Sequence, residues 1–187
     1  MHGSELSVVC EGLLSKIFQP AQETQRGFVV LVTSIHPRAG VSQITRAMAE
    51  SLDQHGSQFA ILLNAREADL KKSVPNAEKR SSNHLFAENW HGLQTHLVSY
   101  FDQLRRELRY VLIDCPSLKD SQDAITLAPL VDGVVLVVEA DRTRKDQILY
   151  AERMIEAARG RLLGHILNRR SYVVPDWLHR RMEAVGI

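Results

Sequence analysis

The chain has 187 residues, of which 44% are hydrophobic and 24% charged, and its formal net charge is +1. These values are typical of a soluble globular protein with one substantial core, and they give no sign of a polyanionic partner. An aromatic content of 6% argues against a base-stacking surface, so we expect no nucleic acid partner.

The first pattern along the chain is an apolar stripe in residues 5–18, where Leu6, Val9, Leu13 and Ile17 recur at helical spacing. It predicts a short amphipathic helix, followed by a polar connector. Such a stripe either packs onto the domain or forms a contact with a partner or a second copy. Both readings stay open at this stage.

From residue 28 onward, short apolar runs alternate with helix-patterned stretches. We expect strands at 28–33, 59–63, 110–114, 133–139 and 162–167. We expect helices at 42–56, 88–108, 120–130 and 144–158, and a long polar loop at 64–88. This alternation predicts an α/β fold of three layers, with a mainly parallel sheet of about five or more strands and helices on both faces.

The pattern favours one domain over residues 1–187. Within it we expect an N-terminal helix and connector (1–26), a core (27–171) and a C-terminal tail (172–187). A cytoplasmic location fits best, because Cys10 and Cys115 are far apart in the chain and are not expected to form a disulfide, and the N-terminus has no signal-peptide pattern. The two cysteines also lack metal-ligand spacing. No apolar run approaches the roughly 20 residues of a membrane helix.

The most informative stretch is TSIHPRAGVSQ at residues 33–43, which joins the first strand to the first core helix. Strand, tight loop and helix start are the place where P-loop proteins hold phosphates. Backbone N–H groups point into such a loop, and the helix dipole behind them favours anions. Here Gly40 is followed by Val41, where a P-loop has its lysine.

Ligands of a parallel sheet bind beyond the carboxyl ends of its strands, so the residues just after each strand carry most information. Asp114 ends the third strand. An acid there, next to a phosphate loop, is a candidate to position magnesium or water, although a loop-capping role is an equal alternative on this residue alone.

These segments resemble a known family. The stretch TSIHPRAGVSQITRAMA (33–49) is similar to the deviant Walker A region of the MinD/ParA class, above all to TSAxPGEGKSTxAxNLA of the bacterial tyrosine kinases of capsule and exopolysaccharide synthesis. The matching residues are Thr33, Ser34, Pro37, Gly40, Ser42 and Ala49. Residues 110–143 and LLGHILN (162–168) resemble later segments of the same family.

The resemblance implies a P-loop NTPase-like fold that binds ATP with magnesium. Ser42 and Asp114 would hold the metal, and Asp114 would also order its water. Asn168 would recognise adenine. The backbone of Arg38, Ala39, Gly40, Val41, Ser42 and Gln43 would cradle the phosphates. The implied partner is a membrane polysaccharide co-polymerase or chain-length regulator, which would bring a cytoplasmic protein to the membrane, and a homo-oligomer is a further option.

Several residues depart from the family pattern. Val41 replaces the lysine, and a valine neither donates hydrogen bonds to phosphates nor neutralises charge. Arg38 replaces a loop glycine, so its Cβ could crowd the phosphates or forbid a left-handed backbone, or its guanidinium could supply the missing charge. Gln43 replaces a second hydroxyl, and Asn64 and Arg66 stand where carboxylates are expected.

Three functions follow from this mixture. The first is a regulatory pseudo-ATPase, related to the tyrosine kinases, whose ATP binding is weak or lost. The second is an active but divergent ATPase or protein tyrosine kinase in which Arg38 replaces the lysine. The family's tyrosine-rich C-terminal tail is missing, with only Tyr172 near that end. The third is a positioning ATPase of the MinD/ParA type.

Overall fold

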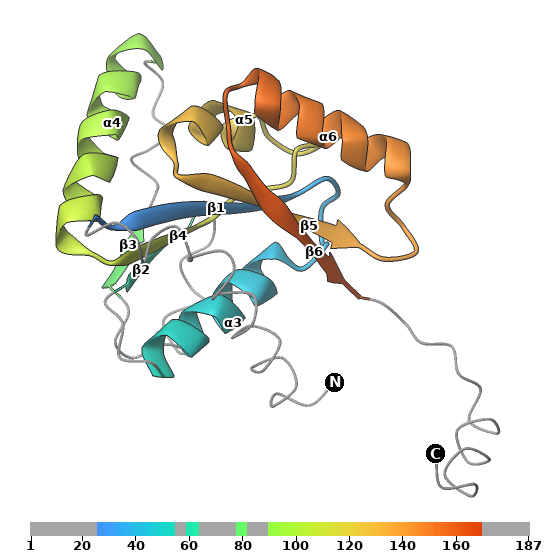
Figure 1. Cartoon of the computed structure of the whole chain (residues 1–187), viewed down its shortest axis with the longest axis horizontal. Helices are drawn as coiled ribbons and strands as arrows, with labels where there is room; N and C mark the ends of the chain where they lie inside the picture. The colour runs from blue at the N-terminus through green and yellow to red at the C-terminus, as the bar shows by residue number, and fades with distance from the viewer. Residues whose placement is uncertain (1–25, 55–58, 64–77, 82–89, 170–187) are drawn as a thin grey trace, which may run out of the picture.

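The structure is a computed structural model, and it describes residues 26–54, 59–63, 78–81 and 90–169 (Figure 1). The amphipathic helix expected at 5–18, the residues Asn64 and Arg66, and the tail with Tyr172 lie outside the described residues.

The described residues form one six-stranded sheet with neighbouring strands parallel, in the order β3-β2-β4-β1-β5-β6. The strands are β1 (Phe28–Ser34), β2 (Phe59–Leu63), β3 (Glu78–Ser81), β4 (Tyr110–Asp114), β5 (Gly133–Glu139) and β6 (Leu162–Asn168). The helices are α3 (Val41–Gln54), α4 (Trp90–Glu107), α5 (Asp123–Leu127), the short 3-10 helix η2 (Ala128–Leu130) and α6 (Lys145–Ala157). This confirms the predicted α/β class and parallel sheet.

One expectation about the elements is wrong. The segment 64–88 was expected to be loop throughout, yet β3 lies within it and pairs in parallel with β2, from Ala60 opposite Glu78 to Leu63 opposite Ser81. The sequence of β3, EKRS, has no apolar run and therefore no strand pattern. Backbone pairing with a neighbouring strand, which local sequence does not show, places it in the sheet.

The helices cover both faces of the sheet. Figure 1 shows α3 on one face and α4, α5 and α6 on the other. Alternate residues of β1 supply the two cores: Val30 and Val32 pack on the α3 side, and Val29 and Leu31 on the α4 side. Because both faces are buried, β1 is apolar over most of its length and shows no polar alternation.

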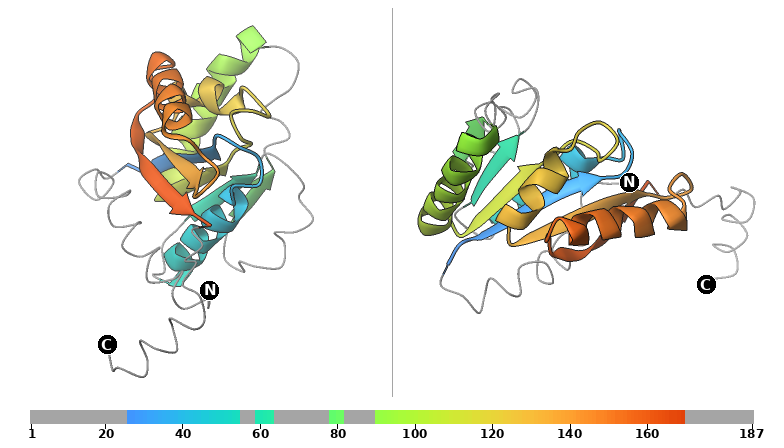
Figure 2. Two further views of the ribbon diagram at one scale, coloured as in Figure 1. Left: turned by 90° about the vertical axis from the view of Figure 1, so that its right-hand side faces the viewer. Right: turned by 90° about the horizontal axis from the view of Figure 1, so that it is seen from above.

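The central strands end together, which positions the site. Val32 lies opposite Asp114 in β4, and Ser34 lies opposite Val137 in β5. The loops that follow β1 and β4 therefore meet Arg169, directly after β6, at one edge of the sheet. The strand arrows in the two views of Figure 2 point toward that edge. In the described part of the chain, every helix falls short of the length and apolar character needed to cross a bilayer.

Candidate functional site

The loop between β1 and α3 is fixed to its neighbours by hydrogen bonds from the end of β1. The Thr33 hydroxyl donates to the carbonyl of Pro116 at 2.7 Å, and the Ser34 hydroxyl donates to the carbonyl of His36 at 2.8 Å. The backbone N–H of Leu118 donates to the Ser34 carbonyl at 2.8 Å. The loop after β4 is thus joined to the phosphate loop by both side chain and backbone.

The phosphate loop contains two left-handed residues. Gly40 has φ 96°, which suits a glycine, but Arg38 has φ 66°. The sequence left open whether a side chain at position 38 would forbid this conformation, and the structure shows that Arg38 adopts it with its side chain exposed. The left-handed region costs a residue with a Cβ about 1–2 kcal/mol, so the loop geometry is kept against a local preference.

The first turn of α3 faces the site. The Gly40 carbonyl accepts the first helical hydrogen bond from the N–H of Ile44 at 3.0 Å, and the Thr45 hydroxyl donates to the Val41 carbonyl at 3.1 Å. The first turn has no acidic residue. The free N–H groups of a helix start and its positive dipole end make this position favourable for an anion.

Val41 contributes no charge at this helix start. Its side chain is only 9% exposed and packs in the core on the α3 side with residues such as Val32, Ala39 and Ile44. A valine there stabilises the contact between helix and sheet by burying apolar surface. The residue that replaces the lysine therefore belongs mainly to the hydrophobic core.

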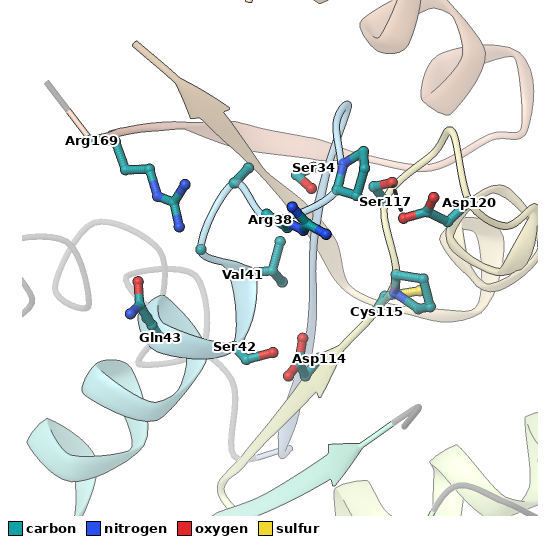
Figure 3. A pocket seen from close by; sticks show the side chains of 14 residues that line it. Ser34, Arg38, Val41, Ser42, Gln43, Asp114, Cys115, Ser117, Asp120 and Arg169 are labelled. Carbon is teal, nitrogen blue, oxygen red and sulfur yellow. Dashed lines mark hydrogen bonds between the residues drawn. The ribbon is translucent and has the colours of Figure 1, made fainter. Parts of the chain in front are cut away.

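Ser42, in the first turn of α3, contacts Asp114 at the end of β4. The two side chains form a hydrogen bond, and Figure 3 shows them pointing toward one another. Burial raises the pKa of Asp114, while the Ser42 hydrogen bond and the positive charge of Arg46 oppose that rise. A hydroxyl and a carboxylate within hydrogen-bonding reach of each other could supply two of the oxygen ligands that magnesium prefers, with phosphate oxygens and water as the other ligands.

Asn168, at the end of β6, contacts the phosphate loop itself. Its amide nitrogen donates to the Ala39 carbonyl at 2.8 Å. The same amide lies so close to Gly40 that a Cβ added there would collide with it. The structure thus brings Asn168 to the site, with its amide nitrogen bonded to the loop backbone.

Arg169, which the sequence analysis did not single out, also lines the site. It has φ 57°, and its guanidinium pairs with Glu139 at 3.3 Å. Burial alone would raise the pKa of Glu139, but the hydrogen bonds and charges of Arg142 and Arg169 hold it below its ordinary value. Its place directly after a strand was the signal that could have found it.

The loops after β1 and β4, the start of α3 and Arg169 surround a cavity of about 320 Å³ at the carboxyl edge of the sheet (Figure 3), and Asn168 is not among the described residues that line it. Of the residues singled out from the sequence, Arg38, Ala39, Gly40, Val41, Ser42, Gln43 and Asp114 line it. On the wall after β4, the Ser117 hydroxyl donates to Asp120 at 2.7 Å. In the described part of the chain, no group of three or more His, Cys, Asp or Glu side chains could hold a metal by itself.

The lining of the cavity has groups that suit the phosphate part of a nucleotide. Loop backbone, helix start and the two arginines suit an anion, and Ser42 with Asp114 suits a metal that the phosphates also bind. The position of the usual lysine carries an apolar, nearly buried side chain instead.

The chain is similar to known proteins in both sequence and fold. No family model matches the chain. It is 30% identical over 72 residues to CapB of Staphylococcus aureus and 31% identical over 75 residues to the tyrosine-protein kinase CpsD of Streptococcus agalactiae. Each alignment covers 38% of this chain and about a third of the relative, 32% and 33% respectively.

The fold of the chain also resembles the fold of a known kinase domain. The kinase domain of VpsO superimposes with a TM-score of 0.72 at 20% identity, over 90% of this chain and 96% of that one. The chain is thus similar to the MinD-like bacterial tyrosine kinases in fold and, over part of its length, in sequence. The MinD cell division protein of Aquifex aeolicus has the same fold at a TM-score of 0.56 and 16% identity, covering 86% of this chain and 73% of MinD.

Proposed function

We propose that this chain is a tyrosine-kinase-like P-loop protein of exopolysaccharide or capsule synthesis that acts as a regulatory pseudo-ATPase with weak or lost ATP binding. The observation that carries the proposal is Val41, which packs into the core at the helix start where the relatives' pattern has its lysine. Charge-assisted hydrogen bonds contribute about 1.5–3 kcal/mol each, so losing the lysine should weaken phosphate binding roughly tenfold to a hundredfold.

The remaining site residues support a role in binding more than in catalysis. Ser42 and Asp114 would hold magnesium once phosphates are present, since they already share a hydrogen bond. The backbone from Arg38 to Gln43 would cradle the phosphates. Without the lysine, the charge that develops on a transferred phosphoryl group has no such counter-charge at the helix start.

Partner and location follow from the resemblance. In this proposal the chain is a single P-loop domain that acts in the cytoplasm and docks to a membrane polysaccharide co-polymerase, alone or as a homo-oligomer. Regulation would come from docking, with the P-loop fold as a stable scaffold.

The proposal is tested by calorimetric titration of ATP with magnesium into the wild type, Val41→Lys and the uncharged control Val41→Met. Val41 lines the cavity, so a lysine at this position could extend its stem to the phosphates. We expect the wild type and Val41→Met to bind at least about tenfold more weakly than Val41→Lys. Low-micromolar binding with hydrolysis by the wild type would contradict the proposal.

A second function is favoured by one observation. The guanidinium of Arg38 points into the cavity (Figure 3), where it could replace the lysine in an active ATPase or tyrosine kinase. In that case the wild type hydrolyses ATP and Arg38→Gln does not. A positioning ATPase of the MinD/ParA type would instead dimerise on adding ATP, which light scattering would detect.

A further inference from the structure

The side chain of Asn168 is hydrogen-bonded to the phosphate loop, and this contact affects which ligand the cavity can bind. An asparagine recognises adenine through both its amide oxygen and its amide nitrogen, which must face the base together. Here the nitrogen donates to the Ala39 carbonyl at 2.8 Å and lies beside Gly40, and Asn168 is not among the described residues that line the cavity. While this contact holds, the amide nitrogen is turned toward the loop backbone, so the oxygen and nitrogen do not face a base together.

The contact also has a structural role. It joins residues 129 positions apart in the chain and holds the carbonyl of Ala39, which lies between the two left-handed residues Arg38 and Gly40. A hydrogen bond at that point opposes relaxation of the strained loop. The orientation of the loop N–H groups toward the cavity therefore depends on Asn168.

Several groups that line the cavity can contact a phosphate. The guanidiniums of Arg38 and Arg169 lie on different sides of the loop (Figure 3), and the helix start lies between them. Arg169 is paired with Glu139 at 3.3 Å, so it would contact a ligand with its remaining N–H groups. Guanidiniums bind phosphate oxygens in a bidentate manner and backbone N–H groups bind them at a helix start, and neither kind of contact depends on the base.

We propose that the cavity binds a diphosphate group without selecting the base attached to it, and that Asn168 is a positioning residue for the loop and does not read adenine. This proposal rests on the proposed function, since it takes the same loop as the ligand site. The ligand class is a diphosphate, whether inorganic or part of a larger molecule.

The test is a calorimetric titration of inorganic pyrophosphate, ADP, GDP and UDP, each with magnesium, into the wild type and Asn168→Ala. For the wild type we expect dissociation constants that agree within about threefold across all four ligands. For Asn168→Ala we expect pyrophosphate and ADP to weaken by the same factor, about twofold to tenfold, as for the loss of one hydrogen bond.

The ratio of the pyrophosphate and ADP constants separates the two roles of Asn168. Because this ratio does not depend on the fraction of folded protein, it remains informative even if Asn168→Ala is partly unfolded. Leu167→Ala is the matched control, since Leu167 precedes Asn168 in β6, is 56% exposed and does not line the cavity. It should leave all four constants unchanged.

Three results would overturn the proposal: ADP binding at least about tenfold tighter than GDP and UDP, an Asn168→Ala variant that loses ADP affinity but keeps its pyrophosphate affinity, or no binding of any of the four ligands. These outcomes are distinct from failure of the proposed function. Hydrolysis of ATP by the wild type would refute the pseudo-ATPase proposal but would not show whether the cavity selects a base. Selection of one base would refute the present proposal even if the protein does not hydrolyse ATP.

Discussion

Arg38 occupies the left-handed region at φ 66° in a loop where the family pattern that this segment resembles has a glycine. Its position carries two separate properties, a backbone conformation that disfavours any Cβ and a guanidinium that lines the cavity. Substitutions can separate them, because alanine removes only the charge and glycine removes the charge and the strain together.

Arg38→Gly should be more stable than Arg38→Ala by about 1 kcal/mol, since glycine adopts positive φ without a Cβ penalty. The free energy of unfolding in urea measures the difference. Both variants should bind pyrophosphate more weakly than the wild type, by a similar factor, because both lack the guanidinium. An alanine variant as stable as the glycine variant would show that the loop is not strained at this residue.

Asp114 gives a pH-dependent prediction. Burial raises its pKa, so over the pH range between the unfolded and native pKa values the native state binds more protons than the unfolded chain. The free energy of unfolding therefore falls as pH rises through that range, and the ionised carboxylate destabilises the fold at neutral pH. As pH falls from neutrality through the native pKa, this destabilisation is relieved.

We expect Asp114→Asn to be more stable than the wild type at neutral pH, with the difference narrowing as the pH is lowered through the native pKa of Asp114. Urea unfolding at a series of pH values measures this. Ser42→Ala removes a hydrogen bond that opposes the rise in pKa, so it should move the pH dependence toward higher pH. Equal stability of wild type and Asp114→Asn at every pH would contradict the argument.

At the scale of elements, a cluster of charged residues connects α4 to the sheet at the edge away from the site. The Arg105 side chain is 7% exposed; its Nε donates to Asp132 at 2.9 Å and its Nη2 donates to the Leu130 carbonyl at 2.8 Å. Asp132 also accepts the N–H of Val29 at 2.8 Å. One carboxylate thus connects α4, the start of β1 and the turn before β5.

Asp132→Ala should lower the free energy of unfolding by about 3 kcal/mol or more, because it leaves the buried Arg105 charge without this partner. Arg26→Ala is the matched control: Arg26 pairs with the same carboxylate at 3.7 Å, but its side chain is 59% exposed. An exposed pair contributes about 0–1 kcal/mol, so this loss should be small. The free energy of unfolding in urea measures both effects. A similar decrease in the two variants would contradict the expectation that the buried pair stabilises the fold more than the exposed pair.

At the scale of the whole molecule, the parallel connections bring the loops after β1 and β4 and the end of β6 to one edge although they are far apart in the chain. These loops lie at the edge of the sheet, and this chain keeps the fold of its structural neighbours although its phosphate loop departs from the family pattern. The fold depends on apolar strands buried on both faces, and Val41 adds to that burial.

Local patterns in the sequence were enough to predict the α/β class, the parallel sheet and the place of the phosphate loop. Apolar runs such as FVVLV and GVVLVVE indicate buried strands by themselves, and helix periodicity is likewise a short-range property. Asp114 could be singled out because it ends a predicted strand. Gly40 and Ser42 could be singled out because they lie just before and at the start of a predicted helix.

Only the tertiary structure decided the contacts between distant segments. It put β3 in the sheet through backbone pairing, bonded Asn168 to Ala39 and brought Arg169 into the cavity. It also showed that Arg38 adopts a left-handed backbone and that Val41 packs in the core. These features depend on pairing and packing between residues up to 129 positions apart, and the free energy of such contacts leaves no periodic trace in the local sequence.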